Sequence, residues 1–482
     1  MVTPAEAFHE AIRLYRAGDA PAALSLCEKL LPVAPDRAEI WQLSGLAAFA
    51  MGNYTGAGHR FARALLLAPG DAAYTVNFAN ALIKLDRDAE AERALMSLAT
   101  PRSAEAETTL GLLARRAGRL DDAVAHADAA LAVAPGSYEA LVNRGRALHE
   151  LGWFDDAIAS YDAAIAVDPA AAPAHGQKAL SLLRTGRLAE GWREYEWRGE
   201  GGDLQSRARF AEPEWDGAPL AGRTLLVHAE QGFGDSIQFA RFLPLVEAAG
   251  GSVIFEVQPA LTRLFTGFSP SIRVVERGAA LPPFDLQIRL MSLPRVLGAD
   301  LGSLPPPVAF AARASGIILP PDPRPTVALC WAGNPAHEND RNRSVLPAAL
   351  EPLGRVGGIR FVSVQKLGSD GGPVPAFVEI DLGPRLVDFA DLKAVLEQVD
   401  LLVSVDTAPA HLMGSLGRPV WLLLPEPPDW RWQPKRDDSP WYPSMRLYRQ
   451  WGRGEWLEPV EQVAAMLGRI AEKGVPRPAS SD

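Results

Sequence analysis

One 34-residue period runs through residues 4–200 and restricts the fold of this part of the chain more than any other feature. Pro35 and Pro69 are 34 residues apart, and so are Pro135 and Pro169. A period of this length corresponds to one pair of helices, in which small residues allow close approach and a proline ends the second helix. The pattern therefore predicts a stacked solenoid of helix pairs. Further pairs of small residues share the register: Gly18 with Gly52, Gly111 with Gly145, Gly118 with Gly152, and Ala123 with Ala157.

The repeat resembles the tetratricopeptide repeat. Segment 72–103 is degenerate and about two residues short, which predicts a distorted repeat there. Counting it, we expect about five repeats and a sixth, over 172–198, that caps the stack. The resemblance implies a groove for a protein or peptide partner, and the alternative is a spacer or dimerisation arm. One unit carries residues at the signature positions of the family: Trp41, Gly45, Tyr54, Ala57, Phe61, Ala64 and Pro69.

Size and composition exclude several classes of protein. A chain of 482 residues contains more than one domain. Its net charge of −10 argues against general nucleic-acid binding. Cys27 and Cys330 form no disulfide framework and no metal-ligand spacing, which fits a reducing compartment. The first ten residues lack the pattern of a signal peptide, and no run of about 18 apolar residues predicts a membrane span. We therefore expect a cytoplasmic protein.

The composition changes near residue 200, where glycine and proline become frequent over Gly199–Gly202 and Pro213–Gly222. Short apolar runs then alternate with helical patterns, which predicts parallel βαβ units. A proline-rich break over Pro320–Pro325 separates two such series. The predicted architecture is α + α/β, with a repeat domain over 1–200 and two sheet lobes over 201–320 and 321–482. Strands are expected at 224–228, 253–257, 272–275, 284–288, 326–332, 359–364, 378–381, 400–405 and 419–424, and a final helix at 459–473.

A motif late in the chain, from Ser404 to His411, is typical of a strand that ends in a turn and a helix start. The apolar strand ends at Val405, and Thr407 and the small Ala408 open the helix. The first N–H groups of a helix and its dipole favour an anion, so this helix start is a candidate phosphate seat. Asp406 is a candidate ligand for sugar hydroxyls or for a nucleotide. His411 shares a helix face with Thr407 and either hydrogen-bonds a donor molecule or holds the loop.

A second motif follows the first strand of the first lobe, where Gly232 and Gly234 permit a turn. Asp235 then stands at a helix start, where it is either a helix cap or a residue facing the cleft between the lobes. The spacing lacks the third glycine of a dinucleotide fingerprint, which excludes that function. Gln231 and the two glycines are candidates for binding an acceptor substrate or for supporting the loop.

Basic and aromatic residues lie at other strand ends of the second lobe. Arg343 binds a diphosphate or is a solvated loop residue, and the same choice applies to Arg341. Asn334 and Lys366 also follow strands and are candidates for binding the same ligand, the donor substrate. Trp430, Arg431 and Trp432 lie in the loop after strand 419–424, where the tryptophans either stack on a ring of the ligand or pack in the core.

Metal chemistry is not expected. The one Asp-x-Asp sequence, Asp86-Arg87-Asp88, lies in the degenerate repeat and is interpreted as a turn between helices. No His-Glu-x-x-His sequence and no cysteine cluster occurs. We therefore expect neither a metal nor another cofactor, so helix starts and basic side chains would have to neutralise a leaving diphosphate.

The two motifs together resemble the heptosyltransferase-like family, glycosyltransferase family 9, whose members have the GT-B fold of two Rossmann-like lobes. Gly232-Phe233-Gly234-Asp235, with Pro244 downstream, is similar to the amino-lobe motif, and Ser404 to His411 is similar to the donor motif of the carboxyl lobe. The resemblance covers roughly residues 222–470. The whole arrangement, with repeats ahead of this region and the junction Glu194-Tyr195-Glu196-Trp197-Arg198, is similar to bacterial repeat-containing glycosyltransferases, some of which modify proteins such as flagellin. The O-GlcNAc transferases share the layout.

The family's roles carry over to individual positions. The resemblance implies that Asp235 is the catalytic base and that Asp406 contacts the donor sugar. Thr407 and the backbone of Ala408 match the diphosphate contacts, although the usual glycine after the threonine is Ala408 here. Arg343 stands where the family commonly has a lysine that binds the donor.

Two hypotheses follow from these patterns. The first is a metal-independent inverting glycosyltransferase that transfers a sugar from a nucleotide sugar to a protein hydroxyl, for example on flagellin, held by the repeats. The second is a non-catalytic tetratricopeptide adaptor or scaffold with a degenerate transferase domain. The sugar, the nucleotide, the acceptor and the oligomeric state are not indicated by the sequence.

Overall fold

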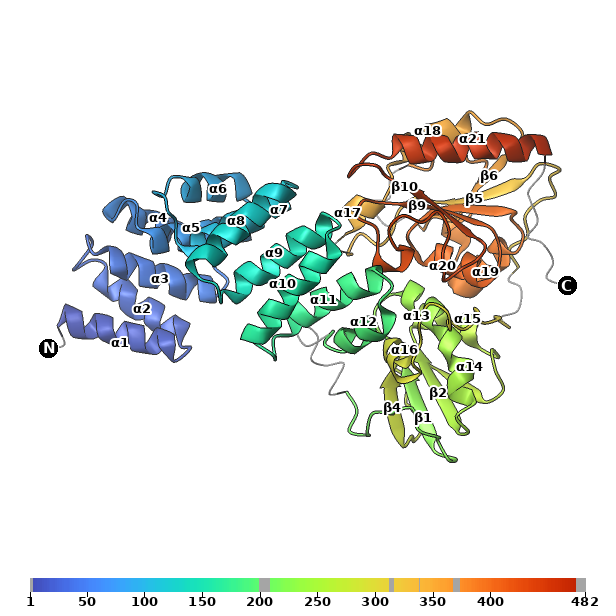
Figure 1. Cartoon of the computed structure of the whole chain (residues 1–482), viewed down its shortest axis with the longest axis horizontal. Coiled ribbons are helices and arrows are strands. Elements are labelled where there is room, and N and C mark those ends of the chain that lie inside the picture. The colour runs from blue at the N-terminus through green and yellow to red at the C-terminus, as the bar shows by residue number, and fades with distance from the viewer. Residues whose placement is uncertain (1–2, 199–208, 312–315, 338, 367–372, 474–482) are drawn as a thin grey trace. The chain divides into compact units, whose positions relative to one another are not determined.

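The computed structural model describes residues 3–198, 209–311, 316–337, 339–366 and 373–473 (Figure 1). The predicted loop Gly199–Gly202 and the loop residue Glu338 lie outside these residues. The chain divides into two compact units, Met1–Lys178 and Ala179–Asp482. The division falls inside a helix, before the change of composition at residue 200. No described helix has the length and apolar character needed to cross a bilayer.

The first unit consists of antiparallel helix pairs, as the 34-residue period predicts. Pro69, Pro135 and Pro169 each lie two residues beyond the second helix of a pair. A Cβ atom added to Gly45 would lie 2.4 Å from Phe61, which explains why a glycine is needed where two helices approach. The helices are α1 Pro4–Arg16, α2 Ala20–Leu30, α3 Ala38–Ala50, α4 Tyr54–Leu67, α5 Ala72–Lys84, α6 Asp88–Met96, α7 Ala104–Arg116, α8 Leu120–Val133, α9 Tyr138–Glu150, α10 Phe154–Val167 and α11 Ala172–Arg184.

The repeat over 72–103 is distorted, as expected. Its second helix, α6, has only 9 residues, whereas α4 has 14. The turn between its helices also departs from the others. Gly18, Gly52, Gly118 and Gly152 adopt positive φ in this turn, and Asp86 takes the equivalent position with φ of 56°. The interpretation of Asp86-Arg87-Asp88 as a turn between helices is confirmed.

The last helix pair extends into the second unit. Helix α12, Leu188–Tyr195, and the end of α11 bury Leu183, Leu188 and Trp192 in the main core of that unit. The ring of Trp192 meets those of Phe239 and Trp430 edge to face. The sixth pair therefore ends the repeats by packing on the sheet region, whereas a terminal capping repeat usually presents a polar face to solvent.

The second unit contains two parallel sheets. The first has the strand order β3-β2-β1-β4, and the second has the order β10-β9-β8-β5-β6-β7. All nine predicted strands are present, but the edge strand β10 was missed. The strands are β1 Thr224–His228, β2 Ser252–Val257, β3 Ile272–Glu276, β4 Leu286–Arg289, β5 Thr326–Cys330, β6 Arg360–Ser363, β7 Ile380–Asp381, β8 Leu401–Val405, β9 Val420–Leu424 and β10 Met445–Arg449.

Short helices follow most strands, as parallel connections require. The final helix is confirmed as α21, two residues longer at its start than predicted. The α-helices of this region are α13 Phe233–Phe239, α14 Leu243–Glu247, α15 Thr262–Phe265, α16 Leu293–Val296, α17 Asp340–Arg343, α18 Glu351–Gly354, α19 Phe389–Leu396, α20 Ala408–Ser415 and α21 Leu457–Lys473. The 3-10 helices are η1 Ala240–Phe242, η2 Pro259–Leu261, η3 Leu290–Ser292, η4 Pro347–Leu350, η5 Gly383–Arg385 and η6 Trp430–Trp432.

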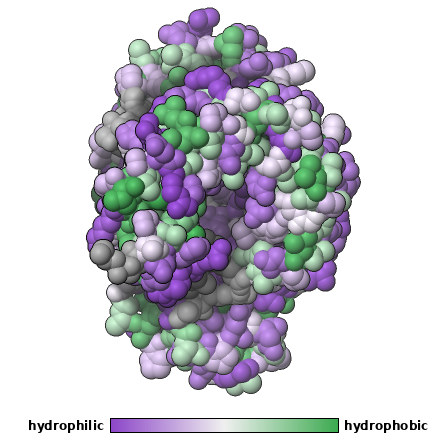
Figure 2. Space-filling model, turned by 90° about the vertical axis from the view of Figure 1, so that its left-hand side faces the viewer, coloured by the Kyte–Doolittle hydropathy of each residue, from purple (hydrophilic) through white to green (hydrophobic). Residues whose placement is uncertain are grey.

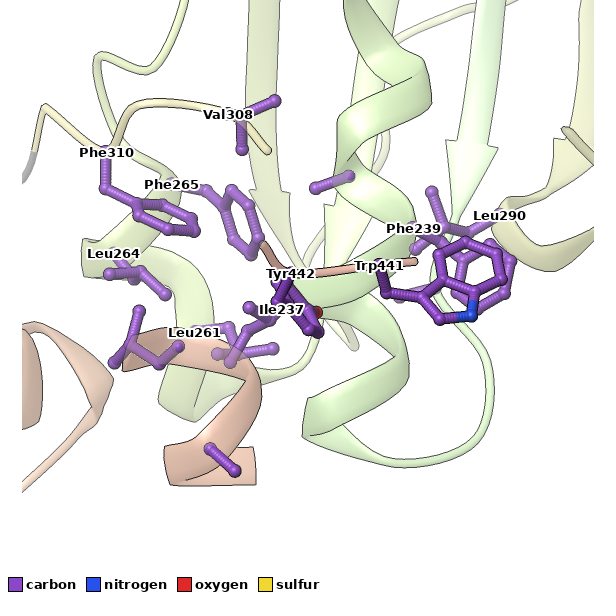
Figure 3. Close-up of a cluster of buried hydrophobic side chains, with 14 of the residues drawn as sticks. Ile237, Phe239, Leu261, Leu264, Phe265, Leu290, Val308, Phe310, Trp441 and Tyr442 are labelled. Carbon is purple, nitrogen blue, oxygen red and sulfur yellow. The ribbon is translucent and has the colours of Figure 1, made fainter. Parts of the chain in front are cut away.

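One apolar core joins the two sheets. Figure 3 shows Ile237 and Phe239 of α13 beside Trp441 and Tyr442, which come from the segment before β10. The opposite face of the second sheet has its own core, covered by α21. Outside these cores, the face drawn in Figure 2 is largely hydrophilic, with hydrophobic residues in small scattered groups. The shared core is what keeps the carboxyl ends of β1 and β8 in one region.

Candidate functional site

The starts of helices α13 and α20 pack against each other, and each follows a central strand of its sheet. A Cβ atom added to Gly234 would lie 2.8 Å from Cδ2 of His411 and 3.6 Å from the Cα atom of Ala408. A glycine at this position therefore allows the two helices to approach closely. The carboxyl ends of parallel strands are the usual ligand-binding edge of such sheets, so this junction is the candidate site.

Asp235 is the third residue of α13 and has two partners. Its Oδ2 accepts a hydrogen bond from the backbone N–H of Gly232 at 2.9 Å, and its Oδ1 forms an ion pair with Arg431. Burial raises the pKa of Asp235, while Arg431 and the Gly232 N–H partly oppose the rise. The side chain is still 18% exposed. Asp235 thus caps the loop and also has a raised proton affinity.

Arg431, on η6, is the central cation of the junction. Its Nη1 also pairs with Asp429 at 2.9 Å, and its Nε donates to Oε1 of Gln238 at 2.5 Å. The guanidinium lies 4.4 Å from the centre of the Trp430 ring. The sequence located Arg431 near the site but gave it no role, because its partner Asp235 is 196 residues away in the chain.

Asp406 follows β8 and lies in the same region as Arg431. Its Oδ2 accepts a hydrogen bond from Nε1 of Trp432 at 2.8 Å. Burial is the main cause that raises the pKa of Asp406 to about 6, with a further contribution from Asp429; Trp432 and Arg431 lower it. Trp432 is buried, which favours the packing alternative of the sequence analysis; its hydrogen bond to Asp406 is a role that the sequence did not indicate.

His411 is enclosed by its neighbours. Its Nδ1 is 3.0 Å from the hydroxyl of Tyr442, its ring centre is 5.6 Å from that of Trp432, and its Nε2 is 3.8 Å from Oδ1 of Asp406. Burial lowers the pKa of His411, and nearby arginines lower it further, which favours the neutral imidazole. Of the two alternatives for His411, this environment favours holding the loop.

The start of α20 has fewer backbone N–H groups without a hydrogen-bond partner than the sequence predicts. Thr407 is the N-cap residue, and its buried hydroxyl lies 3.3 Å from Oγ of Ser404. Pro409 has no N–H, and the N–H of Ala410 donates to the carbonyl of Thr407 at 3.0 Å. Among the first three positions of the helix, only Ala408 has an N–H that bonds to no described residue. The first three positions of this helix therefore present one N–H group, that of Ala408, to an anion.

Arg343 lies at this edge, held by two hydrogen bonds. Its Nε donates to Oδ1 of Asp340 at 3.0 Å and its Nη1 donates to the carbonyl of Asp406 at 3.1 Å. The exposed Arg341 lines a separate cavity of about 640 Å³ with Glu458 and Glu461. Arg343 therefore lies beside Asp406, whereas Arg341 lies at the separate cavity.

Two other donor-binding candidates have contacts away from the cluster. Asn334 is exposed, and its Oδ1 accepts the N–H of Ala336 at 3.1 Å within its own loop. Lys366 is exposed, and its Nζ is 3.4 Å from the carbonyl of Val387. No contact between these two side chains and Asp406 or Asp235 occurs within the described residues.

The loop before α13 is tied to helix α12. Gln231 has φ of 57°, and its side chain forms hydrogen bonds with the hydroxyl of Tyr195 at 3.0 and 3.2 Å. Arg198 pairs with Glu230 at 2.5 Å. Gln231 thus supports the loop, and so does Gly232, whose N–H donates to the carboxylate of Asp235. Within the described parts of the chain, no three His, Cys, Asp or Glu side chains gather closely enough to hold a metal ion.

Comparisons with known proteins characterise the repeats. The model of the tetratricopeptide repeat matches residues 8–72, 108–164 and 150–195. The distorted pair over 72–103 falls almost entirely between these matches. The amino-terminal region is therefore a stack of tetratricopeptide repeats followed by an α/β region with parallel sheets.

One relative matches nearly the whole chain. Protein FlbA from Caulobacter vibrioides is 29% identical, over 96% of this chain and 83% of that protein. Among solved structures, YrrB, described as a tetratricopeptide protein with an unusual peptide-binding site, is 22% identical over 35% of this chain and 88% of its own, with a TM-score of 0.30. TTC0263, a tetratricopeptide protein from Thermus thermophilus, is 21% identical over 38% of this chain and 100% of its own, with a TM-score of 0.34.

Proposed function

We propose that the second unit is a metal-independent inverting glycosyltransferase with a GT-B arrangement of its two lobes. The donor is a nucleotide sugar, and the acceptor is a hydroxyl on a protein, such as flagellin, that the repeats bind. The observation that carries the proposal is that two successive residues of η6 hold the two carboxylates: Arg431 pairs with Asp235, and Trp432 donates a hydrogen bond to Asp406. These are the two carboxylates that the resemblance assigns to the base and to the donor sugar.

The reaction assigns one step to each group. Asp235 takes the proton of the acceptor hydroxyl while that oxygen forms a bond to the anomeric carbon. The bond from this carbon to the diphosphate breaks on the opposite side, and the nucleoside diphosphate leaves with the electron pair. The raised pKa of Asp235 suits a base at neutral pH. Arg343, which lies beside Asp406, and the N–H of Ala408 would neutralise the leaving diphosphate.

The ion pair with Arg431 holds Asp235 in a state that is not yet a free base. We propose that the diphosphate of the donor draws Arg431 away from Asp235, since a guanidinium binds phosphate with two parallel hydrogen bonds. Donor binding would then free the carboxylate at the stage when the acceptor oxygen attacks the sugar.

The proposal is tested by incubating the full chain with a panel of labelled nucleotide sugars and host-cell extract. Transfer of label to a protein is expected for one or a few donors, and Asp235→Asn should abolish it without loss of folding. Wild-type activity in this variant would exclude Asp235 as the base.

The second candidate function is a tetratricopeptide adaptor with an inactive transferase region. The observation in its favour is that Asp235, Arg431 and His411 are already paired with protein groups, which gives each a structural role. A thermal-shift screen separates the two candidates, because a ligand that binds only the folded state raises Tm. Stabilisation by one nucleoside diphosphate supports the enzyme; no response to any nucleotide, with capture of a partner by the full chain, supports the adaptor.

A further inference from the structure

A cavity of about 350 Å³ lies in the sheet unit and shares no wall residue with the candidate site. Its wall is apolar except for one side chain, that of Arg241 on η1. The apolar part includes Leu245, Phe268, Val308 and the three prolines Pro305–Pro307. Small-molecule sites have volumes of roughly 300–1,000 Å³ and combine apolar walls with a few polar groups, so this cavity has the size and composition of such a site.

Arg241 is only 2% exposed and has neutral partners. Its Nε donates to the carbonyl of Gln238 at 2.9 Å, and its Nη1 donates to the carbonyl of Trp441 at 3.0 Å. Burial lowers the pKa of Arg241, and the nearby Tyr442 opposes the fall. No carboxylate pairs with Arg241 in the part of the chain that the structure describes. A buried guanidinium without a counter-charge still attracts an anion.

The guanidinium of Arg241 reaches the cavity wall. Its Nη1 also contacts the carbonyl of Pro305, a wall residue, at 3.4 Å. This distance exceeds the ordinary range of about 2.7–3.2 Å, so the contact is weak and a charged acceptor would form a stronger bond in its place. Nη2 has no hydrogen-bond partner among the described residues. Nη1 and Nη2 therefore form the pair of donors that a carboxylate accepts with its two oxygens.

The cavity opens at the protein surface. Pro244 and Ala309, which also belong to the wall, are exposed, and Leu245 is 44% exposed. Val308 is buried and belongs to the hydrophobic cluster of Figure 3, which also includes Tyr442. A ligand can therefore enter between exposed apolar residues and place an anionic group at Arg241.

We propose that this cavity binds a small carboxylate with an apolar body. The carboxylate accepts hydrogen bonds from Nη1 and Nη2 of Arg241, and the hydrocarbon part lies against Leu245, Phe268 and the prolines. Inorganic phosphate suits the cavity less well, because the apolar walls offer no donors to its remaining oxygens. The proposal does not depend on the proposed function, since no wall residue is a candidate catalytic or donor-binding residue.

The test compares hexanoate with hexanamide, which has the same apolar chain and a neutral head. Isothermal titration calorimetry of the full chain is expected to show hexanoate binding at least about tenfold tighter than hexanamide. Leu245→Glu adds a negative charge at the cavity entrance and should weaken hexanoate binding about tenfold. Leu346→Glu is the matched control, because Leu346 is also exposed and lines a different cavity. Hexanoate binding should be unchanged in this control.

Arg241→Gln tests the guanidinium directly. The affinity for hexanoate should fall to that for hexanamide, and thermal unfolding checks that the variant folds. If it does not fold, the comparison of Leu245→Glu with Leu346→Glu gives the answer. Absence of hexanoate binding, equal affinity for the two probes, or unchanged hexanoate binding in Leu245→Glu would overturn the proposal. Binding of inorganic phosphate as tight as that of hexanoate would also overturn it, because charge alone would then be recognised.

Discussion

The repeat unit and the sheet unit each contain an arginine that is at least partly buried, and the two arginines differ in their ion-pair and hydrogen-bond partners. Arg431 is 9% exposed in its side chain and has Asp235, Asp429 and Gln238 as partners. Arg146 is partly buried and forms no ion pair or hydrogen bond with a described residue, although Glu150 nearby opposes the fall of its pKa. Their pKa values shift accordingly, upward for Arg431, whose carboxylates outweigh burial, and downward for Arg146.

The difference shows how far the charge of each arginine is balanced within the protein. The charges around Arg431 are balanced within the protein, so a ligand there must exchange one partner for another. The charge of Arg146 has no ion-pair partner among the described residues, and the nearby Glu150 pairs with Arg115. The first arrangement suits a reaction in which a carboxylate is released from its partner, whereas the second leaves a buried charge that costs stability.

The largest effect is expected for Asp235→Asn. If Asp235 is released from Arg431 to act as base, the variant should lose at least about a hundredfold in kcat. The measurement is the initial rate of sugar transfer at saturating donor. Asp388→Asn is a matched control, because Asp388 also caps a helix start and pairs with an arginine, Arg263 at 2.9 Å. A similar loss in the control would mean that capping, and not proton transfer, explains the effect.

The charge balance at Arg431 is tested by Arg431→Gln. Removing the shared cation leaves Asp235 and Asp429 in an enclosed site without their partner, which should cost about 3–5 kcal/mol of unfolding free energy. Urea denaturation gives this value. In the double variant with Asp235→Asn the loss should be clearly smaller than the sum of the single losses. Additive losses would show that the two residues are not coupled.

Close packing of the two helix starts is tested by Gly234→Ala. The added Cβ would lie 2.8 Å from Cδ2 of the buried His411, so the helices must separate or the histidine must move. A loss of about 1–3 kcal/mol in stability is expected. Gly357→Ala is the control, since a Cβ there meets nothing within 4 Å and φ is not positive. Equal stability of the two variants would mean that the junction is loose.

Much of the fold follows from local sequence patterns. The 34-residue period predicted the helix pairs, and the apolar runs predicted nine strands. Strand β10 was missed because exposed Arg446 and half-buried Arg449 interrupt its apolar pattern and because it follows an aromatic segment. Edge strands depend on the neighbouring strand for their pairing, here β9, and that information lies outside the segment itself.

The candidate site could be predicted only in part. Asp235, Asp406 and Arg343 follow strands, and the carboxyl ends of parallel strands meet, so the sequence brought them to one edge. The roles of Arg431 and Trp432 depend on contacts with residues far along the chain, which no local pattern encodes. The missing N–H of Pro409 is an exception, because it is visible in the sequence and weakens the predicted phosphate site.

A smaller effect is expected for Asp406→Asn, and its sign depends on pH. Burial raises the pKa of Asp406 from 3.8 to about 6, so the folded state prefers the protonated form. The wild type therefore loses stability as the pH rises through about 6, whereas the asparagine variant does not. The variant should be more stable by up to about 3 kcal/mol near neutral pH and equal near pH 4. Urea titrations at the two pH values test this, and a pH-independent difference would contradict it.

The smallest effect separates the two arginines of α9. Methionine at position 146 removes an unpaired charge and keeps most of the apolar stem, so Arg146→Met should leave stability unchanged or raise it by up to about 1 kcal/mol. Arg144→Met removes two hydrogen bonds at a half-exposed site and should lower stability by a few tenths to about 1 kcal/mol. Thermal unfolding of the two variants side by side gives the difference. A loss in Arg146→Met as large as in Arg144→Met would show that Arg146 has a protein partner after all, and the contrast with Arg431 would disappear.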